Sequence, residues 1–316
     1  MKKIFICILS AVILLNIEVV SAQTLNCNDM LANGSTGSRV KILQTKLNKV
    51  MNCNLDVDGY VGPITESCII KFQQKYNLNV DGVAGPQTCT KLNTLYTQEI
   101  NKRYIVVTGN DVHIRKRPSL QIDDSILTTV NQGRILRTYG TKTIDGITWY
   151  IIHVKQNNET IKAYIHSNYA QKTAIILNIT NQKLTYYYNG KILMESPVIT
   201  GQKNLHETPV GKYIIDPATK YQNKTIAGYY VDGIITNSQV NYWIPFTTNE
   251  EIGFHDASWR TDTEYTKNTY LTNGSIGGID MKQEDAKKLY KYINKKTYVI
   301  VTKSKVGNYY LLFTIN

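Results

Sequence analysis

Cysteine is missing from most of this sequence: all five cysteines of the 316 residues lie at or before position 89. Residues 90–316 therefore have no thiol that could act as a nucleophile, bind a metal or form a disulfide. The sequence also has no Cys-x-x-Cys pair and no histidine near a cysteine, so the usual spacing of a structural zinc site is lacking. We expect neither a metal site nor a bound cofactor.

Long apolar runs are also scarce. One mostly apolar run, residues 4–15, follows Lys2 and Lys3 and precedes small residues that end at Ala22, a pattern typical of a secretory signal peptide. Such a run is too short for a membrane-spanning helix. We expect removal of residues 1–22, no membrane span afterwards, and secretion to the periplasm or cell wall.

Acidic residues are outnumbered, 24 against 36 basic residues, which gives a formal net charge of +12. The basic residues form no dense run, and export would separate the protein from nucleic acid, so we expect no nucleic-acid partner. A basic exported protein is attracted to the anionic components of a cell envelope. Charge that serves only solubility is the alternative.

Four cysteines remain once the signal peptide has taken Cys7 with it. An even number of cysteines in a short exported segment is typical of disulfides, so we predict two bridges. Three pairings are possible, and the sequence does not choose among them. The residues are Cys27, Cys53, Cys68 and Cys89.

An internal repeat marks the predicted first domain, residues 31–95. Residues 55–65 and 78–88 each contain an Asp-Gly turn followed by Gly-Pro-x-Thr. Proline suits the first position of a helix, and apolar residues then recur at helical spacing, which predicts three helices. The segment resembles the small three-helix peptidoglycan-binding domain of many wall enzymes. This resemblance implies peptidoglycan as a partner, while the turn residues themselves are expected to serve folding.

The predicted second domain, residues 103–171, has short alternating runs with turn signals, an all-β pattern. Residues 112–118 resemble the opening of bacterial SH3-like barrels, with Arg117 where that family usually has glycine. Whether such a barrel binds a ligand or is only a spacer stays open. Three histidines alternate with apolar residues on these strands and are expected at the barrel surface: His113, His153 and His166.

The predicted third domain, residues 173–302, is again rich in strand-forming runs, with one amphipathic helix over residues 283–294. Residues 303–316 can add an extra strand. Four blocks resemble L,D-transpeptidases of the YkuD type in order and spacing. They are residues 198–201 with 208–213, 240–246, 253–260 and 270–281.

The resemblance implies a multidomain fold: a small α-helical domain, a small all-β barrel, and a mainly-β L,D-transpeptidase-like domain with one or two helices. In that family a cysteine thiolate attacks a stem-peptide carbonyl, and an amine resolves the thioester. His255 matches the family's base, and Ser275 matches a residue that positions the nucleophile loop. The resemblance also implies a substrate cleft that is lined by Trp243, Trp259, Gly277 and Asp280.

Three positions of the nucleophile loop depart from the family. Gly278 stands at the cysteine position, Ile276 at a histidine position, and Asp280 where asparagine or arginine is usual. Glycine has no side chain to carry an acyl group, and loss of one member of a nucleophile–base unit costs several orders of magnitude in rate. Enzymatic activity therefore stays an open question.

Three hypotheses follow from these departures. The first is an exported pseudoenzyme that binds peptidoglycan without turnover, or scaffolds an active transpeptidase relative. The second is an active acyl transferase that uses a substitute nucleophile such as Ser275. The third is an adhesin whose third domain is only structural. D-Alanine release would distinguish the second from the others.

Overall fold

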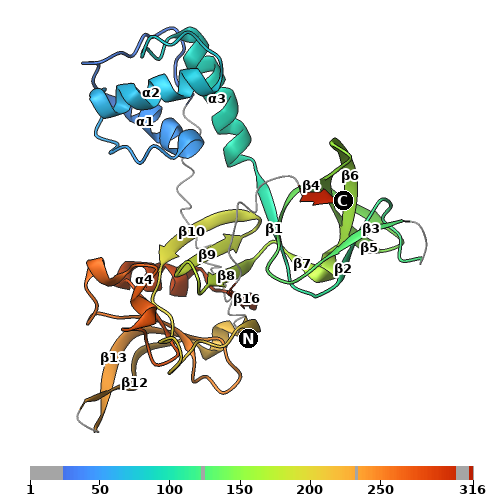
Figure 1. The fold of residues 1–316 in the computed structure, drawn as a ribbon, viewed down its shortest axis with the longest axis vertical. Coiled ribbons are helices and arrows are strands. Elements are labelled where there is room, and N and C mark those ends of the chain that lie inside the picture. The colour runs from blue at the N-terminus through green and yellow to red at the C-terminus, as the bar shows by residue number, and fades with distance from the viewer. Residues whose placement is uncertain (1–23, 122–124, 232–233, 304–312, 316) are drawn as a thin grey trace, which may run out of the picture. The chain divides into compact units, whose positions relative to one another are not determined.

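A computed structural model describes residues 24–121, 125–231, 234–303 and 313–315 (Figure 1). The chain forms two compact units, one ending at Asn101 and the other beginning at Lys102. The predicted signal peptide, residues 1–22, lies outside the described residues. In the described parts, no helix combines the length and the apolar character needed to cross a bilayer.

The first unit contains three α-helices: α1 (Ser38–Met51), α2 (Pro63–Lys75) and α3 (Pro86–Ile100). Both α2 and α3 begin with proline after a glycine N-cap, where the repeat predicts helix starts. The helices share one apolar core, which includes Leu43, Phe72 and Leu92. The prediction of a helical N-terminal region is therefore confirmed.

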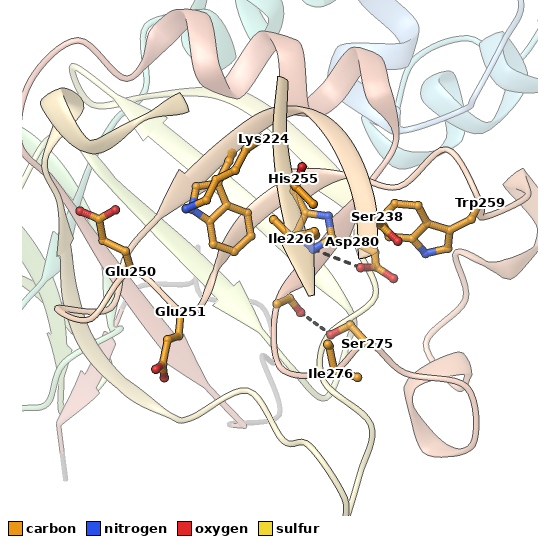
Figure 2. A pocket seen from close by; sticks show the side chains of 13 residues that line it. Lys224, Ile226, Ser238, Glu250, Glu251, His255, Trp259, Ser275, Ile276 and Asp280 are labelled. Atoms are coloured by element: carbon orange, nitrogen blue, oxygen red, sulfur yellow. Dashed lines mark hydrogen bonds and ion pairs between the residues drawn. The ribbon is translucent and has the colours of Figure 1, made fainter. Parts of the chain in front are cut away.

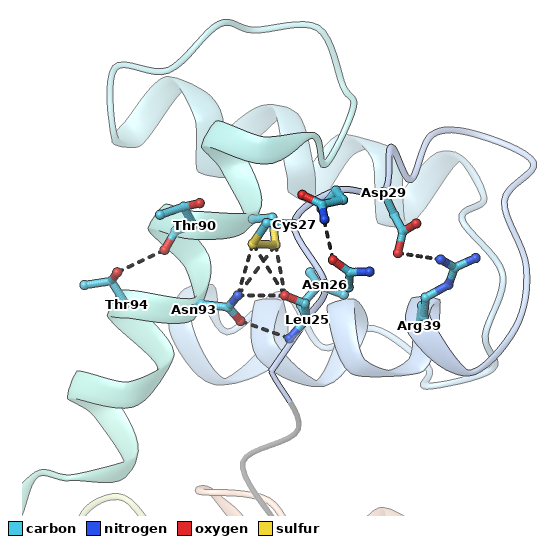
Figure 3. Close-up of a disulfide and its surroundings, with 10 residues drawn as sticks. Leu25, Asn26, Cys27, Asp29, Arg39, Thr90, Asn93 and Thr94 are labelled. Atoms are coloured by element: carbon cyan, nitrogen blue, oxygen red, sulfur yellow. Dashed lines mark hydrogen bonds and ion pairs between the residues drawn. A yellow bond between two sulfur atoms is a disulfide. The ribbon is translucent and has the colours of Figure 1, made fainter.

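Two disulfides close this unit. Cys27–Cys89 joins the segment before α1 to α3 (Figure 3), and Cys53–Cys68 joins the segment after α1 to α2. Their Cα–Cα separations are 5.3 and 6.2 Å, within the usual range for a disulfide. The structure confirms two bridges and selects one of the three possible pairings.

A buried glutamine holds each turn of the repeat. The Gln44 side-chain amide donates to Asp58 and Thr65, and its carbonyl oxygen accepts from the Gly59 N–H. The second copy has the same contacts, from Gln73 to Asp81, Thr88 and Gly82. Sequence reasoning missed both glutamines, because they lie outside the two repeated stretches.

The second unit begins with a sheet of strand order β3-β2-β6-β5-β4-β1-β7. Among the described strands this sheet does not close on itself, so the predicted barrel is not confirmed and the SH3-like resemblance stays a prediction. Strand β17 (Phe313–Ile315) near the end of the chain pairs in parallel with β5. The remaining elements are β1 (Arg103–Val107), β2 (Val112–Arg115), β3 (Ile126–Val130), β4 (Ile135–Ile144), β5 (Ile147–Gln156), β6 (Glu159–His166), the 3-10 helix η1 (Ser167–Tyr169) and β7 (Ala170–Gln171).

Two further sheets follow, with the orders β10-β9-β8-β16-β11 and β12-β13-β14-β15. The pairs β8–β16 and β14–β15 are parallel, and the other neighbours are antiparallel. The strands are β8 (Ala174–Asn178), β9 (Lys183–Tyr188), β10 (Lys191–Pro197), β11 (Gly211–Ile215), β12 (Tyr221–Val231), β13 (Ile234–Pro245), β14 (Gly253–Asp256), β15 (Ile279–Met281) and β16 (Thr297–Thr302).

One α-helix, α4 (Gln283–Tyr292), follows β15 and buries Ala286 and Leu289 in a core shared with both of these sheets. Helix α4 begins where the predicted helix begins and ends two residues before the predicted end at residue 294. Three short 3-10 helices complete this part of the chain: η2 (Pro217–Thr219), η3 (Asp262–Glu264) and η4 (Thr269–Leu271). The prediction of a mainly-β third region is confirmed.

Strand β1 is buried on both faces. Ile105 and Val107 belong to the core of the first sheet, whereas Tyr104 and Val106 pack with Ile176 and Ile300 of the sheet that contains β8 and β16. Side chains alternate between the faces of a strand, so one strand serves both cores. The predicted second and third domains therefore share an apolar interface.

Candidate active site

The parallel strands β14 and β15 bring the candidate residues together. His255 of β14 and Asp280 of β15 are register partners, and the loop of residues 275–278 leads directly into β15. Backbone bonds tie this segment to its neighbours: the Ser275 N–H donates to Thr200, and the Asp280 N–H donates to Ile199. The site therefore rests on strands rather than on free loops.

The position expected to hold a nucleophile faces the imidazole directly. A Cβ built on Gly278 would lie 2.9 Å from Nε2 of His255, closer than real Cβ contacts allow. The φ angle of Gly278 is outside the left-handed region, so its backbone can accept a side chain. What opposes a side chain here is the position of the imidazole, because the ring stands where a nucleophile would begin.

His255 is buried, with 3% of its surface exposed. Its Nδ1 lies 3.1 Å from the carbonyl oxygen of Asp256, which can only accept, so Nδ1 carries a proton. Its Nε2 lies 3.4 Å from Oδ1 of Asp280. Trp243 stacks on the ring at a centroid distance of 5.6 Å, and Trp259 lies at 5.8 Å. The imidazole is thus held on both nitrogens and flanked by two indoles.

Asp280 belongs to a chain of charged side chains that is buried at Asp280 and Arg260 and partly exposed at Glu264. Its Oδ2 accepts from Nε of Arg260 at 2.9 Å, and Arg260 also pairs with Glu264 at 3.2 Å. The Asp280 side chain is 2% exposed, and Figure 2 shows its carboxylate directed at His255. Burial raises the pKa of Asp280, and the charges of His255 and Arg260 oppose this without cancelling it. Oδ1 of Asp280 is thus the group that faces Nε2 of His255.

Ser275 braces the loop. Its hydroxyl donates to the carbonyl oxygen of Gly278 at 2.5 Å (Figure 2) and accepts from the Gly277 N–H at 3.2 Å. The Thr208 hydroxyl supports the same turn by donating to the Gly277 carbonyl at 2.8 Å. Gly277 has a φ of 113°, a conformation that other residues rarely adopt. Each of these contacts fixes the backbone around the vacant position.

A cavity of about 350 Å³ opens in front of these residues. Seven of the eight sequence-predicted site residues line it, and Gly277 does not. Among the described residues, the buried indole N–H of Trp243 has no hydrogen-bond partner. The seven are Trp243, His255, Trp259, Ser275, Ile276, Gly278 and Asp280.

Other residues of the site were missed from the sequence. Lys224, Glu250 and Glu251 line the cavity, and Arg260 with Glu264 continues the chain of charges from Asp280. An unusual acid at position 280 was the one available signal, because a buried carboxylate needs a cationic partner. The sequence alone did not show which of the nearby basic residues would supply it.

Comparison with known proteins fits this geometry. Residues 172–301 match the family model of the L,D-transpeptidase catalytic domain, YkuD, and residues 36–92 match that of a peptidoglycan-binding domain. This chain carries an L,D-transpeptidase catalytic domain. The YkuD domain so defined begins at β8 and ends within β16, so it contains every residue of the candidate site.

Three similar proteins illustrate the match. An L,D-transpeptidase from Enterococcus faecium is 30% identical over 42% of this chain and 50% of its own, with a TM-score of 0.37. A zinc D-Ala-D-Ala carboxypeptidase from Streptomyces albus G is 37% identical over 67 residues, 21% of this chain and 26% of its own length. An uncharacterised protein from Kitasatospora aureofaciens is 43% identical over 65 residues, 20% of this chain and 55% of its own. The chain thus spans about half or less of each relative.

Proposed function

We propose that this protein is an exported, peptidoglycan-binding member of the L,D-transpeptidase family whose YkuD domain holds stem peptides without transferring them. The observation that carries the proposal is the nucleophile position. Gly278 offers no reacting atom, and Nε2 of His255 stands 2.9 Å from where its Cβ would be. Residues 90–316 contain no other thiol.

The groups that face the two ring nitrogens of His255 support the same conclusion. A general base must accept a proton from the attacking group, and its free lone pair must face that group. Here Nδ1 of His255 is committed to Asp256, and Nε2 faces the Asp280 carboxylate. Asp280 therefore competes with any attacking group for the position in front of Nε2 of His255.

The substitute-nucleophile hypothesis has weaker support. A serine nucleophile needs its hydroxyl hydrogen directed at a base. The Ser275 hydroxyl instead donates to the Gly278 carbonyl, and no bond links it to His255 among the described residues. Attack by Ser275 would require the loop to give up the brace that shapes it.

Binding without turnover suits the rest of the cavity. The indole N–H of Trp243 is buried without a partner among the described residues, and it can donate to a peptide carbonyl or carboxylate once the indole shifts toward the cavity. Lys224 lies above the same indole, 5.0 Å from its centroid, and supplies positive charge at the cavity. Trp259 and Ile276 are partly exposed and offer apolar surface to a ligand.

Calorimetric titration with a tetrapeptide-stem muropeptide, together with a D-alanine release assay, tests the proposal. We expect binding with no release. Trp259→Ala should weaken binding about tenfold, since an exposed aromatic wall contributes about 1–2 kcal/mol. Tyr139→Ala is the matched control, because Tyr139 is similarly exposed but does not line the cavity. Equal binding by Trp259→Ala and the native protein would favour the adhesin hypothesis.

A revertant series tests the chemical part. We expect no release from Gly278→Cys with Ile276→His, because Asp280 still occupies His255, and measurable release when Asp280→Asn is added. D-Alanine release by the native protein, abolished in Ser275→Ala, would overturn the proposal in favour of the serine enzyme.

A further inference from the structure

A second cavity, of about 260 Å³, lies outside the YkuD domain, in the first sheet of the second unit. Strand β2 supplies His113 and Arg115, while Trp149 of β5 and His166 of β6 line it as well. Trp149 is 1% exposed, and its ring meets that of His166 edge-on at 5.1 Å. The lining of the cavity thus combines the apolar ring of Trp149 with nitrogen atoms of one arginine and two histidines.

Arg115 is a buried cation with neutral partners. It is 6% exposed, and its guanidinium donates to the Gln121 carbonyl, the Ser125 hydroxyl and Nδ1 of His113, at 3.2, 3.1 and 3.0 Å. Among the described residues it has no carboxylate partner. Arginine stays charged at any ordinary pH and carries five N–H groups, so two of them remain to be satisfied. A buried charge without a counter-ion is unfavourable.

The other polar groups of the cavity also present donors. Arg115 can only donate, so Nδ1 of His113 accepts and the proton of that ring sits on Nε2. His166 is arranged alike, because its Nδ1 accepts from the Asn168 N–H at 3.0 Å. Asn110 uses its amide oxygen to accept from Gln132, which leaves its NH₂ group. Four neighbouring side chains therefore offer hydrogen-bond donors.

One carboxylate lines the cavity, that of Asp111, an exposed residue in the loop before β2. It forms no ion pair with Arg115 within the described parts of the chain. Asp111 has a φ of 52°, so the turn, rather than a contact with Arg115, accounts for its place. Among the residues that the structure describes, the buried guanidinium therefore has no carboxylate partner, and it lies next to an open space.

We propose that this cavity binds the oxyanion group of a small ligand, a carboxylate or a phosphate. The anion accepts from the two remaining N–H groups of Arg115 and from the Nε2–H of His113 or His166, while Trp149 contacts the attached apolar part. At about 30 Å³ per water-sized group, the cavity holds roughly nine non-hydrogen atoms. The ligand part that enters is therefore the size of one amino-acid residue or one glycerol phosphate.

A purely structural Arg115 is the competing explanation. Its bonds to Gln121 and Ser125 hold the segment after β2. Three neutral acceptors fix that geometry, yet they do not neutralise the charge, and a structural role does not account for the hydrogen-bond donors that remain on His113, His166 and Asn110. The two explanations differ in whether an anion binds at all.

Two-dimensional NMR titration of the mature chain separates them. The probes are N-acetylglycine and glycerol 1-phosphate, with N-acetylglycinamide and glycerol as uncharged counterparts. We expect saturable shifts at the amides of β2 and η1 with at least one of the two anions and with neither uncharged probe. Whichever anion binds more tightly identifies the source of the oxyanion. Shifts with the uncharged probes of equal size, or no saturation with either anion, would overturn the proposal.

Three variants complete the test. Arg115→Gln should weaken binding at least tenfold, and Asp111→Asn should strengthen it two- to fivefold by removing a like charge, because asparagine accepts the left-handed backbone. His113→Gln, at an exposed position, covers the case in which Arg115→Gln fails to fold, and should weaken binding severalfold. His153→Gln is the matched control, since His153 stacks on Tyr139 away from the cavity and should leave affinity unchanged. Unchanged affinity in His113→Gln together with Asp111→Asn would contradict the site.

Discussion

At the scale of single residues, the departures from the family pattern at Gly278 and Asp280 act together on His255. Loss of a side chain at 278 gives the His255 ring room, and a carboxylate at 280 gives its Nε2 a partner at 3.4 Å. Arg260 then stabilises that carboxylate from its other oxygen. Restoring a nucleophile alone would therefore return a thiol to a place that is already occupied and negatively charged.

The reactivity of a thiol introduced by Gly278→Cys provides a direct measure of this. The Asp280 carboxylate should raise the pKa of that thiol, and His255 is not free to stabilise the thiolate. We expect iodoacetamide to alkylate it slowly at pH 7 and about tenfold faster when Asp280→Asn is added, which corresponds to one pKa unit. The described native cysteines are all in disulfides and will not interfere.

Ile276→Cys is the matched control for this measurement, because residue 276 lines the same cavity and is 37% exposed. Its alkylation rate should change little between the Asp280 and Asn backgrounds. A thiol at 278 that reacts equally fast in both backgrounds would show that Asp280 does not control the site.

The structure brings most of the predicted site residues to one cavity, whereas their interactions were not predicted. Matching blocks located His255 and the vacant position 278, because backbone loops keep their spacing in sequence. The approach of Asp280 to His255 could not be predicted, since it depends on the register of two strands far apart in the chain. Arg260 was missed for the same reason: its role arises only once β14 and β15 lie side by side.

At the scale of elements, the two Asp-Gly turns of the first unit repeat the same set of hydrogen bonds. Asp58 accepts from Gln44 and from the Tyr60 N–H, and these bonds lower its pKa below the ordinary value of 3.8. Asp81 is lowered likewise, by the Val83 N–H first and Gln73 second. Each carboxylate thus contributes stability as an anion.

This predicts acid sensitivity of the first unit. A group whose pKa is lower in the folded state adds stability above its unfolded pKa, and that contribution is lost as the pH falls through the folded pKa. The urea midpoint of α1–α3, followed by NMR in the intact chain, should therefore drop as the pH is lowered from about 5 to about 3. In Asp58→Asn with Asp81→Asn the drop should be smaller. An identical pH dependence in this variant would contradict the assignment.

Helix starts were well predicted because proline at the first position is a local signal, confirmed at Pro63 and Pro86. The disulfide pairing could not be predicted, because it depends on how the three helices pack. Closure of the first sheet into a barrel is not confirmed among the described strands. Alternating runs indicate strands and their faces, but not whether the edge strands meet.

At the scale of the whole molecule, β1 couples the first sheet to the YkuD domain. Tyr104 and Val106 bury apolar surface against Ile176 and Ile300, and β17 returns from the far end of the chain to pair with β5. The two regions distinguished in the sequence are therefore expected to unfold together, because neither can expose this interface without loss of stability.

Calorimetry of fragments tests this coupling. Residues 102–316 should unfold in a single transition, and residues 173–316 alone should unfold at a lower temperature, because they expose the apolar face of β8 and β16. Two well-separated transitions in the larger fragment, or an unchanged transition temperature in the smaller one, would show that the regions are independent.

The Cys27–Cys89 bridge has a mechanical consequence. It links positions separated by 62 residues, near the two ends of the first unit. A pull applied to those ends passes through the sulfur–sulfur bond, so α1, α2 and the first residues of α3, which lie between the two cysteines, bear no load. At about 3.4 Å per extended residue, roughly 200 Å of chain is withheld from stretching. The unit can therefore transmit tension between its ends while the segment enclosed by the disulfide stays folded.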